Sequence, residues 1–219
     1  YEAPIYGMLD VQDAVAKHDW GGLPRPAVSL YGQPDDEAKP TLLWDGEWEI
    51  TYVTFRDMGV AFAMAILGIY ILVVAQFRSF VLPLVILTPI PLTLIGIVAG
   101  HMLFNAPFTA TSMIGFIALA GIIVRNSILL VDFTNQLRAH GVELDEAIER
   151  AGETRFVPIL LTSATAIGGL LPLALQNVGL YSPMAWVIIG GLVTSTFLAR
   201  LVTPVMYKLF TPDVEVKPA

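Results

Sequence analysis

The chain has 219 residues, of which 55% are hydrophobic and only 14% are charged, and its mean hydropathy is +0.69. This composition excludes an ordinary soluble domain and indicates a membrane protein. The net charge of −7 argues against a nucleic-acid partner, and the absence of cysteine excludes disulfides, thiolate metal sites and cysteine nucleophiles.

The N-terminal segment, residues 1–56, is polar and rich in glycine and proline, so we expect it to lie in water. It begins with Tyr1, and no signal peptide precedes the first apolar run, so we expect the chain to be a piece of a longer protein. Asp45-Gly46-Glu47 separates two apolar or β-branched stretches at 41–44 and 48–55, which predicts a β-hairpin. The hairpin would edge an assembly interface or pack on a domain whose remainder is missing.

Long apolar runs follow, each of about 20 residues or more, which is the length that a helix needs to cross a bilayer. The sequence therefore predicts an all-α polytopic membrane protein with a transmembrane bundle at 57–210 and a tail at 211–219. Five helices are expected, at about 58–77, 81–103, 109–133, 156–175 and 184–210. Prolines in the second run and Pro204 in the last predict kinks.

A short amphipathic helix is also expected between the third and fourth crossings, at about 143–152. Its apolar residues recur at helical spacing and form one face, which is typical of a helix lying on a membrane surface. These residues are Leu144, Ala147, Ile148 and Ala151.

The loop charges predict the orientation. Arg78 lies in the first connection and Arg138 and Arg150 in or beside the third, whereas the second and fourth connections carry no lysine or arginine. By the positive-inside rule, the first and third loops and the C-terminus are cytoplasmic. The N-terminal segment is then periplasmic, as the end of a periplasmic domain.

Charged and hydroxyl residues inside the third and fourth runs are the candidate functional site. Arg125 lies deep in the third run, and a charge there costs at least about 2.5–3.5 kcal/mol unless it has a partner or a function. Asp132 follows two helical turns later, and the fourth run carries Arg155, Thr162 and Ser163 with the same spacing. These residues predict a polar seam inside the bundle, although Arg155 alone would be an interfacial anchor and Asp132 alone a charge near a helix end.

Arg125 needs a carboxylate at its own depth, because arginine does not deprotonate in proteins. Asp132 is the only acid within a predicted crossing, and it lies near that crossing's end. We therefore expect the partner to come from another segment. Arg200 in the last run would pair with Asp132 or extend towards the membrane interface. The methionines do not recur at ligand spacing, so no metal site is expected.

Two stretches carry a family resemblance: Phe108 to Phe133, including Gly121-Ile-Ile-Val-Arg125-Asn126-Ser127, and Arg155-Phe-Val-Pro-Ile-Leu-Leu-Thr162-Ser163. The sequence closely resembles the C-terminal end of resistance-nodulation-division (RND) efflux permeases. The resemblance covers nearly the whole chain.

The resemblance implies a secondary transporter rather than an enzyme: a trimeric inner-membrane proton antiporter that expels amphiphilic compounds. It needs no cofactor beyond the proton motive force, and it works with a periplasmic adaptor and an outer-membrane channel. The family's proton relay combines two aspartates of the fourth helix with groups that correspond here to Arg125, Arg155 and Thr162. From their positions in the same two runs, we expect Asn126, Asp132 and Ser163 to be supporting residues. The best-known pumps have lysine where this chain has Arg125, which implies a fixed countercharge here.

Three alternatives stay open. Heavy-metal efflux or a protein-export accessory role belongs to the same superfamily. The chain could also be a truncated, non-transporting membrane fragment, because half of a relay does not couple protons to transport.

Overall fold

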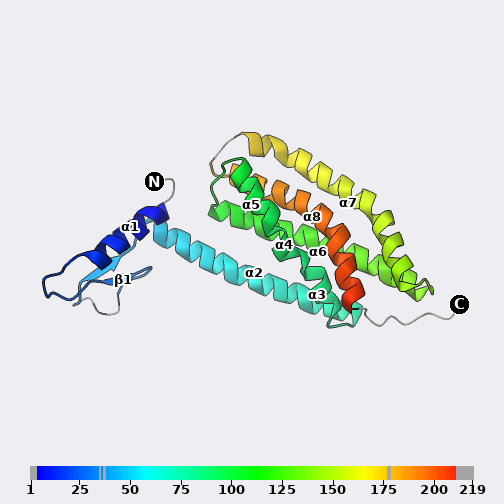
Figure 1. The fold of residues 1–219 in the computed structure, drawn as a ribbon, viewed down its shortest axis with the longest axis horizontal. Coiled ribbons are helices and arrows are strands. Elements are labelled where there is room, and N and C mark those ends of the chain that lie inside the picture. The colour runs from blue at the N-terminus through cyan, green and yellow to red at the C-terminus, as the bar shows by residue number, and fades with distance from the viewer. Residues whose placement is uncertain (1–3, 35, 37, 177–178, 211–219) are drawn as a thin grey trace. The chain divides into compact units, whose positions relative to one another are not determined.

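The structure is a computed structural model, and it describes residues 4–34, 36, 38–176 and 179–210 (Figure 1). The chain divides into two compact units, Tyr1–Ala61 and Phe62–Ala219. The predicted cytoplasmic tail, 211–219, lies outside the described residues. The helices and strands are α1 (Pro4–Lys17), β1 (Ala27–Ser29), β2 (Thr41–Leu43), α2 (Glu47–Phe77), α3 (Leu82–Leu87), α4 (Pro89–Leu92), α5 (Leu94–Leu103), α6 (Ala110–Ala139), α7 (Leu144–Leu175) and α8 (Ser182–Phe210).

The protein is an all-α polytopic membrane protein, as predicted. Four spans in the described part of the chain are long and apolar enough to cross a membrane, and the bent α8 makes five if both its parts form one span. The short strands β1 and β2 pair with each other in parallel, with Val28 opposite Leu42.

The predicted hairpin around Asp45-Gly46-Glu47 is wrong. Gly46 has a φ of 74°, and its carbonyl accepts the first backbone hydrogen bond of α2, from Ile50. Glu47 and Glu49 place negative charge in the first helical turn, where the helix dipole favours it. The Asp-Gly pair therefore starts a helix, and β2 finds its partner upstream in β1.

The apolar residues that suggested a strand at 48–52 also fit a helix, because Trp48 and Tyr52 are one turn apart. The Trp48 indole donates a 3.0 Å hydrogen bond to the Leu30 carbonyl, and Tyr52 stacks on Tyr31 at a centroid distance of 4.8 Å. The 14-residue helix α1 was not predicted either, although Met8, Gln12 and Val15 recur at helical spacing and are buried or half-buried.

The second crossing is broken into α3, α4 and α5, which confirms the kink expected from its prolines. Pro89 and Pro91 have no backbone N–H, so the helical hydrogen-bond ladder is interrupted there. Threonine hydroxyls at the breaks bond carbonyls of the preceding turn: Thr88 donates to Leu84 and Thr93 to Ile90, both at 2.6 Å.

The predicted surface helix at 143–152 and the crossing at 156–175 form one continuous helix, α7, of 32 residues. The separation was wrong because Glu153, Thr154 and Arg155 contain no helix breaker, so their polarity changes the environment without ending the helix. The apolar face was right, since Ala147 and Ala151 are fully buried.

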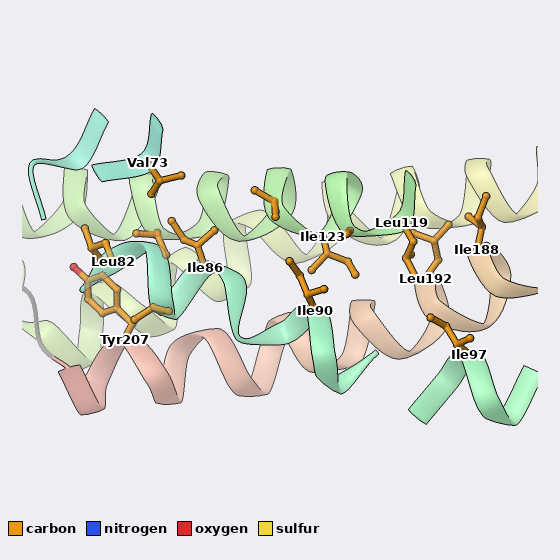
Figure 2. Packing of buried hydrophobic residues seen from close by; sticks show 14 of the residues in the cluster. Val73, Leu82, Ile86, Ile90, Ile97, Leu119, Ile123, Ile188, Leu192 and Tyr207 are labelled. Atoms are coloured by element: carbon orange, nitrogen blue, oxygen red, sulfur yellow. The ribbon is translucent and has the colours of Figure 1, made fainter. Parts of the chain in front are cut away.

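Helix α8 is the centre of the second unit and contacts each helix from α3 to α7 (Figure 1). Its backbone approaches α5 closely through glycine: a Cβ on Gly96 would lie 2.4 Å from the Gly190 carbonyl. Figure 2 shows side chains of α3 to α6, α8 and the end of α2 meeting in one apolar core, with Leu119 and Leu192 side by side. The axis of α8 turns by 48° between Leu198 and Arg200, beside the carbonyl that Pro204 leaves without a helical donor.

Candidate functional site

A cavity of about 230 Å³ between α6 and α7 holds the predicted relay residues. Helix α6 contributes Arg125, Asn126 and Leu129, and α7 contributes Arg155, Pro158, Ile159 and Thr162. We call it the arginine cavity. The structure therefore brings Arg125 of α6 together with Arg155 and Thr162 of α7.

Helix periodicity explains why these side chains meet. On α6, Gly121, Arg125 and Leu129 are spaced by four residues and are all exposed, whereas neighbours such as Ile123 and Val124 are buried against the core. The outward stripe of α6 thus carries the arginine, and α7 runs beside it (Figure 1). On α7, Arg155, Pro158 and Thr162 share one face at spacings of three and four.

Arg155 is held at the cavity by an aromatic ring that sequence reasoning missed. Its guanidinium carbon lies 4.8 Å from the centroid of the Phe133 ring, which is a cation–π contact. Its Nε is buried and has no hydrogen-bond partner among the described residues. A buried donor without an acceptor costs about 1–3 kcal/mol, so this group favours an incoming anionic oxygen.

Thr162 is fixed on its own helix. Its hydroxyl donates a 2.5 Å hydrogen bond to the Pro158 carbonyl. The oxygen retains lone pairs that can accept a hydrogen bond from a group in the cavity, because a hydroxyl both donates and accepts.

Of the three predicted supporting residues, one lines the arginine cavity and two do not. Asn126 is 5% exposed and lines the cavity. Ser163 faces the other way, with its hydroxyl 2.9 Å from that of Thr196 on α8, because one residue along a helix rotates the side chain by about 100°. Asp132 does not line the cavity either, and it accepts a 2.8 Å hydrogen bond from the Gln136 amide.

The charge of the cavity is unbalanced. Two guanidinium groups line it, and no carboxylate does among the described residues. No ion pair joins Arg125 or Arg155 to an acid in the part of the chain that the structure describes. Because two unpaired cations in a membrane are costly, the cavity is chemically suited to receive an anionic group.

The sequence was compared with known protein families and proteins. The model of the AcrB/AcrD/AcrF family matches residues 39–211. The chain belongs to this family. It is a region of an RND permease, and these proteins are efflux transporters.

Relatives include both drug and metal resistance proteins. The chain is 36% identical over 169 residues to the multidrug resistance protein MdtC of Escherichia coli (strain UTI89 / UPEC), covering 75% of this chain and 16% of that protein. It is 31% identical over 190 residues to the cobalt-zinc-cadmium resistance protein CzcA of Cupriavidus metallidurans, covering 85% and 18%.

A crystal structure of a heavy metal efflux pump superposes with a TM-score of 0.69 at 29% identity, covering 81% of this chain and 18% of that chain. The present chain thus spans less than a fifth of the length of the relatives it matches.

Proposed function

We propose that this chain supplies the basic and hydroxyl half of the proton relay of an inner-membrane efflux antiporter. The observation that carries the proposal is the arginine cavity, where Arg125, Arg155 and Thr162 converge without a described acid. The carboxylates that titrate would come from the remainder of the permease, as a transmembrane aspartate pair.

The chemistry follows from the charges. When the incoming carboxylates are ionised, Arg125 and Arg155 neutralise them, and the buried Nε of Arg155 gains an acceptor. When protons neutralise the carboxylates, the attraction to the two guanidinium groups falls, so α6 and α7 are free to shift. Arg125 keeps its charge throughout and acts as a fixed pole rather than as a proton carrier.

The remaining parts of the proposal come from the family. We infer a homotrimer in the inner membrane that works with a periplasmic adaptor and an outer-membrane channel. The N-terminal segment lies in the periplasm and the C-terminus in the cytoplasm, which is supported by the distribution of lysine and arginine in the loops.

A growth assay of the full-length permease tests the relay. Expressed in a drug-sensitive host, Arg125→Ala and Arg155→Ala should abolish resistance at unchanged protein levels, because either change leaves anionic groups uncompensated. Arg150→Ala should retain resistance, because Arg150 is more than half exposed and its ion pair among the described residues is with Glu146, one turn away on the same helix. Full resistance in Arg125→Ala would reject the proposed role.

Substrate class has two candidates. We favour amphiphilic compounds, and heavy-metal cations are the alternative because two of the matching crystal structures are of a heavy metal efflux pump. Growth of the same strain on drugs and on zinc, cobalt or cadmium salts separates the two. If the full-length gene product changes neither tolerance, the non-transporting alternative holds instead.

A further inference from the structure

Arg200 on α8 is another cation without a described carboxylate partner. None of the ion pairs in the described residues includes it, and its guanidinium carbon lies 4.5 Å from the centroid of the Phe156 ring on α7. Its side chain is exposed, and it does not line the arginine cavity.

The surroundings of Arg200 on α8 resemble a lipid-facing surface. Phe197, Leu201 and Val205 are 66%, 65% and 63% exposed, and each is a large apolar side chain. On α7, Val157 and Leu161 are exposed to a similar extent, at 66% and 65%. A charged group within such a surface is costly unless it reaches a counter-charge, and hydrocarbon tails offer none.

The level of Arg200 along the helices identifies the counter-charge. Phe156 is the first residue of the apolar run predicted to cross the membrane, so the guanidinium lies at the level where hydrocarbon gives way to headgroups. Lys208, about 12 Å further along α8 at 1.5 Å per residue, pairs with Asp145 of α7 at 2.7 Å, and both are more than half exposed. Arg200 thus lies closer to the membrane centre than the exposed Lys208–Asp145 pair, by about the thickness of the headgroup layer.

A small niche beside Arg200 has room for one oxygen atom. It is lined by Gly152, Phe156 and Arg200, together with Leu130, Ile159 and Thr196, and its volume is about 10 Å³. Gly152 belongs to the lining through its backbone, since it has no side chain. We call it the Arg200 niche.

We propose that the Arg200 niche binds the phosphate of an anionic phospholipid, with Arg200 as the cationic ligand. One phosphate oxygen enters the niche, and Phe156 holds the guanidinium so that its outer N–H groups point to the remaining oxygens. Basic pockets between membrane helices at this level commonly bind anionic headgroups. The site is separate from the arginine cavity and does not depend on proton coupling.

Native mass spectrometry of the delipidated full-length protein tests the site, with phosphatidylglycerol as the probe. Wild-type protein should bind it at least about tenfold more tightly than the Arg200→Gln variant. Arg200→Lys should retain part of the affinity, and Arg150→Gln, a cation already paired on the aqueous side, should retain all of it.

Two further probes identify the ligand. Phosphatidylcholine should bind wild type and Arg200→Gln equally weakly, because its choline already neutralises the phosphate, and inorganic phosphate should not displace phosphatidylglycerol. Equal phosphatidylglycerol affinity in wild type and Arg200→Gln would overturn the proposal. So would a loss of thermal stability in Arg200→Gln that is the same with and without the lipid, which would point to an acid from another protein segment.

Discussion

Single residues determine what the arginine cavity can bind. Arg125 brings a positive charge. Arg155 brings a buried hydrogen-bond donor that has no described acceptor, and Thr162 brings a hydroxyl that is fixed by its own helix. Phe133 orients Arg155 without contributing charge. Each of these groups is complementary to a carboxylate, and no carboxylate of the described residues lines the cavity.

The hydroxyl of Thr162 is expected to contribute to transport. Thr162→Val keeps the shape but removes the hydroxyl, so the full-length permease should lose about tenfold in proton-coupled transport, equivalent to about one hydrogen bond to a charged group. Thr162→Ser should keep most of the activity. The measurement is substrate-driven proton flux in proteoliposomes. Equal rates for Val and wild type would contradict a role for the hydroxyl.

Helix α8 organises the second unit, because glycines on α8 and α5 allow α5 and α6 to approach the backbone of α8. A Cβ on Gly191 would lie 2.0 Å from a methyl carbon of Leu119, and one on Gly96 would lie 1.7 Å from the Thr194 hydroxyl oxygen. These contacts determine the distances at which α5, α6 and α8 pack, and so the position from which α6 presents Arg125.

We therefore predict that Gly96→Ala destabilises the protein by about 1–3 kcal/mol, because helix packing would have to open. Thermal unfolding followed by fluorescence in detergent measures the change. Gly68→Ala on α2 is the matched control, since a Cβ there meets no atom within 4 Å. That variant should be neutral or slightly stabilising, and an equal loss in both variants would contradict the packing account.

Tyr207 links α8 to α6 near the end of the bundle. It is 2% exposed, donates a 2.5 Å hydrogen bond to the Asn135 amide oxygen and accepts a 3.1 Å bond from Arg138. Tyr207→Phe should cost about 1–3 kcal/mol, because it removes both bonds in a buried setting. Tyr70→Phe, whose hydroxyl bonds an exposed carbonyl, should cost less in the same thermal assay. The opposite order would contradict a buried link.

Sequence patterns predicted the membrane helices well, because the length and hydropathy of a span can be read from one contiguous segment without knowledge of its partners. They also predicted the proline breaks in the second crossing. Of the predicted polar seam, Arg125, Arg155 and Thr162 line one cavity, whereas Asp132 and Ser163 do not. They failed where the outcome depends on distant partners. The strand expected at 48–55 is helical because Trp48 and Tyr52 pack on the loop at 30–31. Ser163 faces Thr196 rather than the cavity, and only the packing of α7 on α8 reveals that.

The chain spans less than a fifth of the length of the relatives it matches. Only 11% of the crossing window of α7 and 6% of that of α2 is buried within this chain, so these helices have surfaces to offer to lipid or to the remainder of the permease. Arg155 on α7 is not suited to contact with lipid tails. We therefore predict that acidic residues of the remaining permease contact the arginines of the arginine cavity.

Proton flux through the reconstituted full-length permease tests this central claim most directly. With substrate inside proteoliposomes, Arg125→Ala should lower the substrate-dependent proton flux by at least about 100-fold, since removing one partner of a buried charge pair costs about 3–5 kcal/mol. Arg125→Lys should retain coupling, because it preserves the positive pole. Unchanged proton-coupled flux in Arg125→Ala would contradict the account.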